Sequence, residues 1–255
     1  MGADVQRRKA AAVKCLIIAA GQGTRLRSRT PSKPLAKIAG APLIEHVIRS
    51  ARAGGASQFV VVTGYRAEPL ERCLADIAVR VGVPVTPVRN PAWERPNGLS
   101  VLAAAEALQG EEFILLMSDH LFDPQVLART LAGRRAEAKL TLASDYRLDT
   151  PLLDLDDATK LDVAPDGRIL HLGKTIAGYN AIDTGIFFAG PALLDALRAS
   201  VAAGGSGSLS EGVQVLADGG EAFAFDIGEG WWIDVDDEAA FRRAEASLPP
   251  GFGAS

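Results

Sequence analysis

Short apolar runs alternate with amphipathic stretches along the first half of the chain. The apolar runs are about as long as buried strands and contain many β-branched residues. They cover residues 16–20, 59–63, 84–88, 113–117 and 140–143. Between them, apolar residues recur at helical spacing over 43–53, 68–79, 100–108 and 124–131. Strands that alternate with helices in this way predict βαβ units and a mostly parallel sheet.

The pattern changes near Asp145. Strand-like runs now follow one another directly, and the turn sequence Pro165-Asp166-Gly167 predicts an antiparallel hairpin between the first two. The glycine- and serine-rich residues 204–208 predict a mobile loop. The strand-like runs cover residues 161–164, 169–172, 182–189 and 222–226, and the helical patterns cover 192–199, 209–218 and 237–246.

These patterns predict one α/β domain with three layers, α/β/α, and a Rossmann-like plan. We expect it to cover residues 13–248, after a disordered tail at 1–12. Residues 13–144 form a half with a mostly parallel sheet, and residues 145–248 form a smaller half with antiparallel strands. Ligands of such sheets bind beyond the carboxyl ends of the strands, so we expect the loops there to share one rim.

Composition excludes several classes of protein. Hydrophobic residues make up 48% of the chain, enough for a sizeable core, and the net charge is −4. This balance gives no general attraction to nucleic acid or to an anionic membrane, so an anionic ligand requires a local cluster of Lys and Arg. The two cysteines provide no disulfide framework, and no apolar stretch approaches the ~20 residues of a membrane span. Lys14 interrupts the apolar run that would mimic a signal peptide, so we expect a cytoplasmic protein.

A glycine-rich turn follows the first predicted strand. Its backbone N–H groups approach whatever lies at the strand end, and Arg25 and Lys33 add positive charge, as a polyphosphate site requires. A dinucleotide fingerprint needs a third glycine where Leu26 stands, and a P-loop needs Gly-Lys-Ser/Thr before its helix, so neither motif is present. A structural turn with solvated cations is the alternative. The candidate nucleotide-binding residues here are Ala19, Ala20, Gly21, Gly23, Thr24, Arg25 and Lys33.

Carboxylates follow two other predicted strands. Asp119 ends a fully apolar run, where it can hold Mg²⁺ against triphosphate oxygens. Asp234 lies before the last predicted helix, and its residue type fits a second metal ligand as well as a carboxylate of a surface turn. Asp236 is predicted as the N-cap of that helix. His120 lacks sequence neighbours at metal-ligand spacing, so packing or hydrogen bonding is its expected role.

Asn97-Gly98-Leu99-Ser100 opens a predicted helix. The Asn97 amide can pair with the edge of a base, and Gly98 allows a flat ring to approach the backbone. Capping of the helix by Asn97 or Ser100 is the alternative interpretation, and from spacing alone it is the favoured one.

Several of these motifs resemble known families. The strand followed by Ala-Ala-Gly-x-Gly-Thr-Arg and Lys-Pro-Leu resembles the sugar-nucleotide nucleotidyltransferases, which form activated sugars and alcohols from a nucleoside triphosphate and a phosphomonoester. The narrower signal is similar to the inositol-1-phosphate cytidylyltransferases. It lies in residues 157–160, 172–175 and 179–187, together with Met117-Ser118-Asp119-His120, and the similarity spans roughly residues 14–246.

The resemblance implies that CTP and myo-inositol 1-phosphate give CDP-inositol and pyrophosphate, with Mg²⁺ as cofactor and Arg25, Lys33 and Lys174 as catalytic residues. The first half would bind the nucleotide, with Arg25 and Lys33 on the triphosphate, and the second half would bind the acceptor. Lys174, otherwise a solvated lysine, would hold the acceptor phosphate. In the resemblance Asn97, Gly98 and Ser100 would contact the pyrimidine, Asn180, Asp183 and Thr184 would contact the polyol, and Asp119 and Asp234 would bind the metal.

The implied partners are CTP and a phosphorylated polyol. In the family the enzyme is often fused to a membrane-embedded CDP-alcohol phosphotransferase; we expect this chain to work with a separate one, and a homodimer is compatible with the pattern. One alternative is the same chemistry with another base or acceptor, such as a sugar 1-phosphate or phosphocholine. The other is a non-catalytic domain that senses nucleotides.

Overall fold

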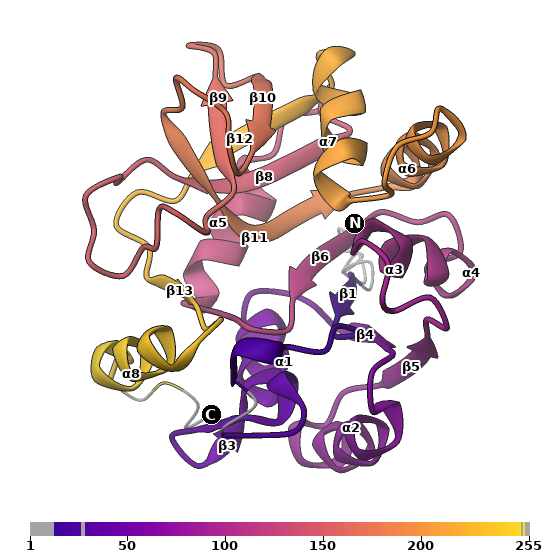
Figure 1. Cartoon of the computed structure of the whole chain (residues 1–255), viewed down its shortest axis with the longest axis vertical. Coiled ribbons are helices and arrows are strands. Elements are labelled where there is room, and N and C mark those ends of the chain that lie inside the picture. Colours follow the sequence, from indigo (N-terminus) through magenta and orange to yellow (C-terminus); the bar gives the residue numbers. More distant parts are fainter. Residues whose placement is uncertain (1–12, 27–28, 251, 253–255) are drawn as a thin grey trace, which may run out of the picture.

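A mixed β-sheet forms the centre of the fold (Figure 1). The computed structural model describes residues 13–26, 29–250 and 252, and within them this sheet has nine strands. The tail predicted at 1–12 lies outside the described residues. Neighbouring strands of the first half pair in parallel in the order β6-β1-β4-β5, as the alternating pattern predicts. These strands are β1 (Lys14–Ile18), β4 (Gln58–Thr63), β5 (Val85–Arg89) and β6 (Phe113–Met117).

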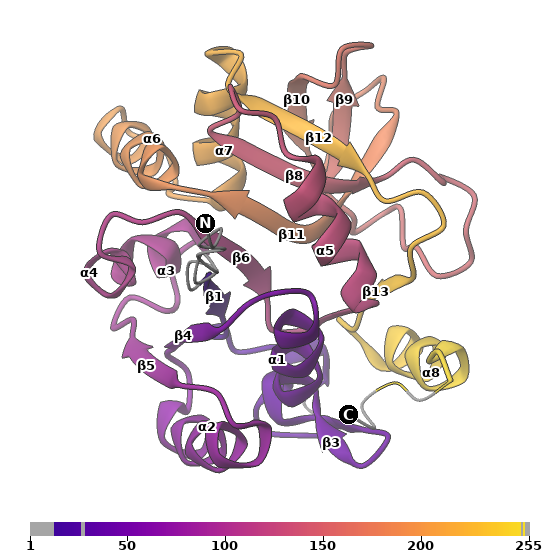
Figure 2. The same ribbon diagram turned by 180° about the vertical axis from the view of Figure 1, so that it is seen from behind.

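The strands of the second half continue the same sheet. β11 (Ala181–Ala189) runs antiparallel to β6 and lies beside it in Figure 2. Its register with β8 shifts between Asp183 and Phe187. Along its other edge, its first residues pair with β9 and its last residues pair with β6. The other strands here are β8 (Leu140–Asp145), β9 (Lys160–Val163), β10 (Ile169–Gly173) and β12 (Ala222–Asp226), with β9 and β10 forming the predicted hairpin.

Helices cover both faces of the sheet, because side chains alternate along each strand. In β1, Cys15 and Ile17 belong to one apolar core, and Leu16 and Ile18 belong to the other. The predicted three-layer α/β/α fold is confirmed. One face carries α1 (Leu43–Ala53), α2 (Ala67–Val81), α5 (Pro124–Gly133) and α8 (Glu238–Ser247). The other carries α3 (Gly98–Ala103), α4 (Ala105–Leu108), α6 (Pro191–Ala202) and α7 (Leu209–Asp218).

Two short ladders were not predicted. β2 (Lys37–Ile38) pairs with β3 (Ala41–Pro42), and β7 (His120–Phe122) pairs with β13 (Trp232–Asp234), which aligns His120 with Asp234. The second ladder joins the end of the parallel half to the segment before α8. Strands of two or three residues carry no readable alternation, so they appear only in the structure.

Two local predictions need comment. Asp236 does not cap α8; the Asp237 carboxylate does so, accepting from the Ala240 N–H at 2.7 Å. The glycine- and serine-rich residues 204–208 are tied to α7, because the Glu211 carboxylate accepts from Ser206 N at 3.1 Å and from Gly207 N at 2.9 Å. In the ranges that the structure describes, no helix combines the length and the apolar character that a membrane span needs.

Candidate active site

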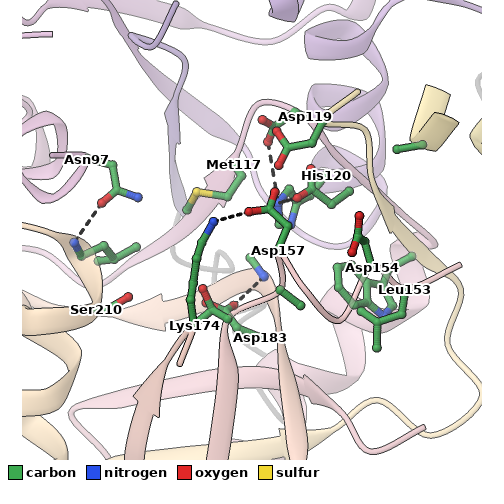
Figure 3. A pocket seen from close by; sticks show the side chains of 18 of the residues that line it. Asn97, Met117, Asp119, His120, Leu153, Asp154, Asp157, Lys174, Asp183 and Ser210 are labelled. Carbon is green, nitrogen blue, oxygen red and sulfur yellow. Dashed lines mark hydrogen bonds and ion pairs between the residues drawn. The ribbon is translucent and has the colours of Figure 1, made fainter. Parts of the chain in front are cut away.

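Two cavities adjoin at the carboxyl ends of β1 and β6. The glycine-loop cavity, about 270 Å³, is lined by residues of the turn after β1 and by Lys33. The β11 cavity, about 260 Å³, is lined by residues of the second half and of α8 (Figure 3). Asn97, Met117, Asp119 and Asp236 line both, so they form the shared wall. Of the predicted loop residues, Ala19, Ala20, Gly21 and Gly23 line the first cavity, whereas Thr24 lines neither.

Lys33 is a buried cation of the glycine-loop cavity, next to the shared wall. It begins a short 3₁₀ helix, η2 (Lys33–Leu35), and its side chain is only 7% exposed. Its Nζ lies 2.5 Å from Oδ2 of Asp119 and also pairs with Asp236. Burial alone would lower the pKa of Lys33, but the carboxylates of Asp119, Asp234 and Asp236 outweigh it and raise the pKa well above its usual value. Lys33 therefore stays charged.

Asp119, His120 and Asp234 form a compact group. One ligand atom of each lies within 4.8 Å of the others, and the β7–β13 ladder creates this proximity. The His120 Nδ1 donates to the Thr184 carbonyl at 2.8 Å, and its Nε2 lies 3.4 Å from Oδ2 of Asp234. Gly185 has φ +74°, and a Cβ there would lie 2.3 Å from His120 Nδ1, so glycine is required. Sequence spacing did not reveal that His120 belongs to this group.

The carboxylates of this group attract positive charge. Burial would lower the pKa of His120, yet Asp234 and Asp119 raise it to about 10. Burial raises the pKa of Asp234. Its Oδ1 is buried without a hydrogen-bond partner among the described residues. A buried carboxylate oxygen without a partner is costly, and a hard cation such as Mg²⁺ would satisfy it.

Arg25 and Lys174 converge on one carboxylate. The Nη1 of Arg25 lies 2.5 Å from Oδ2 of Asp157. The Nζ of Lys174 lies 2.5 Å from Oδ1 of the same residue (Figure 3). The other arm of Arg25, Nη2, pairs with Asp236 at 2.6 Å. Arg25 lies in the 3₁₀ helix η1 (Thr24–Leu26) and lines the β11 cavity, not the glycine-loop cavity. The structure thus brings two of the three predicted phosphate cations, Arg25 and Lys174, together at the junction of the halves.

The segment predicted to contact a base has its own partners. The Asn97 Oδ1 accepts from Leu209 N at 2.9 Å, which ties α3 to α7 instead of capping α3. The Ser100 hydroxyl, lining the glycine-loop cavity, accepts from Asn90 at 3.0 Å. Gly98 lines neither cavity; a Cβ there would lie 2.6 Å from the carbonyl oxygen of Gly207, so close packing explains this glycine. Contact of these residues with a base stays a prediction.

The predicted acceptor residues separate into two groups. Asp183 lines the β11 cavity, and burial raises its pKa to about 6. Asn180 and Thr184 do not line it. The Asn180 amide accepts from and donates to the backbone of Val163 at 2.9 and 2.8 Å, and the Thr184 hydroxyl donates to the Ala143 carbonyl at 2.8 Å. Their contact with a polyol stays a prediction.

Three residues of the site had no such role in the sequence prediction. Asp157 and Asp236 pair with the phosphate cations, and Asp236 had been predicted as a helix cap. Arg243 lines the β11 cavity from α8 and has no hydrogen-bond or ion-pair partner within the described part of the chain. The signal that could have indicated Arg243 is its spacing: Asp237, Ala240 and Arg243 recur every three residues on one helix face.

Comparisons with known proteins agree with this geometry. A family model described as a MobA-like NTP transferase domain matches residues 15–205. Proteins named bifunctional IPC transferase and DIPP synthase are 37% identical (Rubrobacter xylanophilus) and 32% identical (Thermococcus kodakarensis), over 91% and 92% of this chain. Because those matches cover 51% and 50% of the relatives, the chain spans about half the length of the curated relatives it matches.

A solved structure extends the likeness beyond the sheet. The inositol-1-phosphate CTP transferase from T. maritima superposes with a TM-score of 0.80 at 29% identity, covering 90% of this chain and 91% of that one. The resemblance to inositol-1-phosphate cytidylyltransferases predicted from the motifs is confirmed. The family model covers the glycine loop, β11 and nearly all of the parallel strands of the first half. This chain therefore belongs to the nucleotidyltransferases that have a MobA-like NTP transferase domain.

Proposed function

We propose that the protein transfers the cytidylyl group of CTP to the phosphate of myo-inositol 1-phosphate, with pyrophosphate as the second product. The observation that carries this proposal is the pair of adjoining cavities with a shared wall. A nucleotide in the glycine-loop cavity and a phosphomonoester in the β11 cavity would meet at Asp119 and Lys33. The choice of CTP and inositol rests on the likeness to the enzyme from T. maritima and to the relatives named IPC transferase.

The chemistry requires positioning more than acid–base catalysis. An oxygen of the acceptor phosphate forms a bond to the α-phosphorus of CTP, and the bond from that phosphorus to the pyrophosphate oxygen breaks. The attacking oxygen is already anionic, so no general base is needed. The chain must hold two mutually repelling anions in line and neutralise the charge at phosphorus. Lys33 would bind the triphosphate in the glycine-loop cavity, and Lys174 would bind the acceptor phosphate in the β11 cavity. Arg25 pairs with acids beside both lysines, Asp236 next to Lys33 and Asp157 next to Lys174.

Asp119 and Asp234 would hold Mg²⁺, which neutralises charge on phosphate oxygens when bound. Both present carboxylate oxygens, the ligand type that this ion prefers, and the unpartnered Oδ1 of Asp234 is available for it. His120, fixed by its hydrogen bond to Thr184, keeps its Nε2 near both carboxylates and balances their charge.

The acceptor cavity offers both apolar and polar groups. Leu172, Phe187 and Val213 line it, as does the Asp183 carboxylate, which can accept hydrogen bonds from hydroxyl groups of a polyol ring. Arg243 adds a cation that pairs with no acid among the described residues and could meet an anionic acceptor. In this proposal the CDP-alcohol product would be consumed by a CDP-alcohol phosphotransferase.

A screen for pyrophosphate release tests the proposal. Each of the four ribonucleoside triphosphates is paired with inositol 1-phosphate, glucose 1-phosphate, N-acetylglucosamine 1-phosphate and phosphocholine, with Mg²⁺ present. We expect CTP with inositol 1-phosphate to give the highest kcat/KM. A higher value for any other pair would replace the proposed substrates, and no turnover with any pair would contradict the proposed activity.

A further inference from the structure

One carboxylate pairs with two of the cations that line the β11 cavity. Asp157 presents Oδ2 to Arg25 at 2.5 Å. It presents Oδ1 to Lys174, also at 2.5 Å (Figure 3). Arg25 belongs to the turn after β1, and Lys174 directly follows β10, so this single side chain bridges the two halves of the chain. Two oxygens that each meet one cation reproduce the way in which two oxygens of a phosphate would be held.

The exposure of these side chains indicates a contact that can exchange. The side chains of Arg25 and Lys174 are 49% and 57% exposed, and that of Asp157 is 27% exposed. Ion pairs with such exposure add little to stability and can open readily. Asp157 also lies between β8 and β9, within residues 146–159, where the structure has neither helix nor strand. The carboxylate can therefore leave its cations without disturbing the sheet.

We propose that Asp157 is an internal competitor of the acceptor phosphate. It occupies Arg25 and Lys174 in the free protein, and it gives them up when the phosphate of the acceptor binds. The inference rests on the proposed function in one respect, since it assumes that these two cations receive that phosphate. Competition of this kind raises the apparent Kd of the acceptor, because only the fraction of molecules with free cations can bind it.

The proposal predicts the direction in which acceptor binding changes when the Asp157 carboxylate is removed. If Asp157 merely positioned Arg25 and Lys174, its removal would weaken acceptor binding. As a competitor, its removal strengthens binding, because Lys174 and one arm of Arg25 lose their internal partner, while the other arm of Arg25 keeps its pair with Asp236. Each exposed ion pair with Asp157 changes the ratio of occupied to free cations by roughly 1.5- to 5-fold. Asp157→Asn removes two such pairs, so we expect it to lower the Kd of the acceptor roughly fivefold.

Calorimetric titration with myo-inositol 1-phosphate, and separately with inorganic phosphate, measures this effect. Asp157→Asn is compared with two controls. Asp156→Asn removes the same charge one residue away, at an exposed position that pairs with no cation among the described residues and lines neither cavity. Asp157→Glu keeps the charge and should retain a Kd near that of the parent protein. The KM for the acceptor is measured in parallel by pyrophosphate release.

The proposal holds if Asp157→Asn lowers both the Kd and the acceptor KM, if Asp156→Asn leaves them within twofold, and if the gain shrinks when Lys174 is changed to Ala. A weaker or unchanged Kd in Asp157→Asn overturns it, as does an equal gain in Asp156→Asn. If the parent protein neither binds nor uses inositol 1-phosphate, the proposed function fails. The titration with inorganic phosphate then still decides whether Asp157 competes for an anion.

Discussion

Replacing Lys174 by Ala separates the two cavities functionally. Lys174 lines the β11 cavity and not the glycine-loop cavity, so its loss should impair use of the acceptor and leave CTP binding nearly unchanged. A charge-assisted hydrogen bond to phosphate contributes about 1.5–3 kcal/mol. The free protein gives up the exposed pair with Asp157 to form it, which costs about 0.2–1 kcal/mol. The net loss is about 1–2 kcal/mol, or roughly 5- to 30-fold in kcat/KM for the acceptor.

The assay combines kinetics with direct binding. Pyrophosphate release at saturating CTP gives kcat/KM for inositol 1-phosphate, and calorimetry gives the Kd of CTP, which we expect to stay within about twofold. Lys37→Ala is the matched control, because Lys37 is an exposed lysine that lines neither cavity. If CTP affinity falls as steeply as acceptor use, Lys174 serves the triphosphate, and the division of the site into two cavities with separate ligands is wrong.

Other changes test the metal group, the acceptor carboxylate and the loop before α7. Asp119→Ala should lower kcat on the order of a hundredfold or more without altering the circular dichroism spectrum, and full parental activity in excess chelator would refute the metal assignment. Because burial raises the pKa of Asp183 to about 6, kcat/KM for the acceptor should decline as pH falls through about 6. Asp183→Asn should make that decline shallower, leaving the part that comes from protonation of the acceptor phosphate, whose own pKa is about 6. Hydrogen bonds from Ser206 lower the pKa of Glu211 to about 2, so its stabilisation is present above the ordinary value of 4.5 and is lost as pH falls toward 2. Glu211→Gln should therefore lower Tm at about pH 7, and the difference from the parent should narrow near pH 3; an undiminished difference at low pH would contradict this.

The fold was largely predictable because its elements are long enough to show a period. Every strand of the central sheet and both hydrophobic faces followed from alternation and helical spacing. Ala104 interrupts one predicted helix and divides it into α3 and α4. The β7–β13 ladder could not be predicted, since its three-residue strands lie more than a hundred residues apart and pair only once the sheet is formed.

The site residues that directly follow a parallel strand could be predicted from the sequence. Asp119 and the glycine loop share a rim because β6 and β1 are parallel neighbours. The roles of adjacent acids were not predictable: both Asp236 and Asp237 fit a helix cap by type, and only the position of Lys33 and Arg25 assigns Asp236 to them. Likewise, the amide of Asn180 could serve a polyol by type, but in the structure it meets the backbone of β9.

β11 holds the two halves of the chain at a fixed distance, because it pairs with strands of both halves. Residues 186–189 of this strand pair with β6, while Ala181 and Ile182 pair with β9, so main-chain hydrogen bonds cross the boundary between the two halves. The halves cannot swing apart about a hinge without breaking the sheet, and any closure over substrates falls to the loops. The span from the glycine loop to Lys174 is thus a fixed dimension of the frame. In the proposed function that span limits the length of the acceptor. A longer acceptor would require changes in residues 146–159, which have neither helix nor strand, because the frame has no hinge to open.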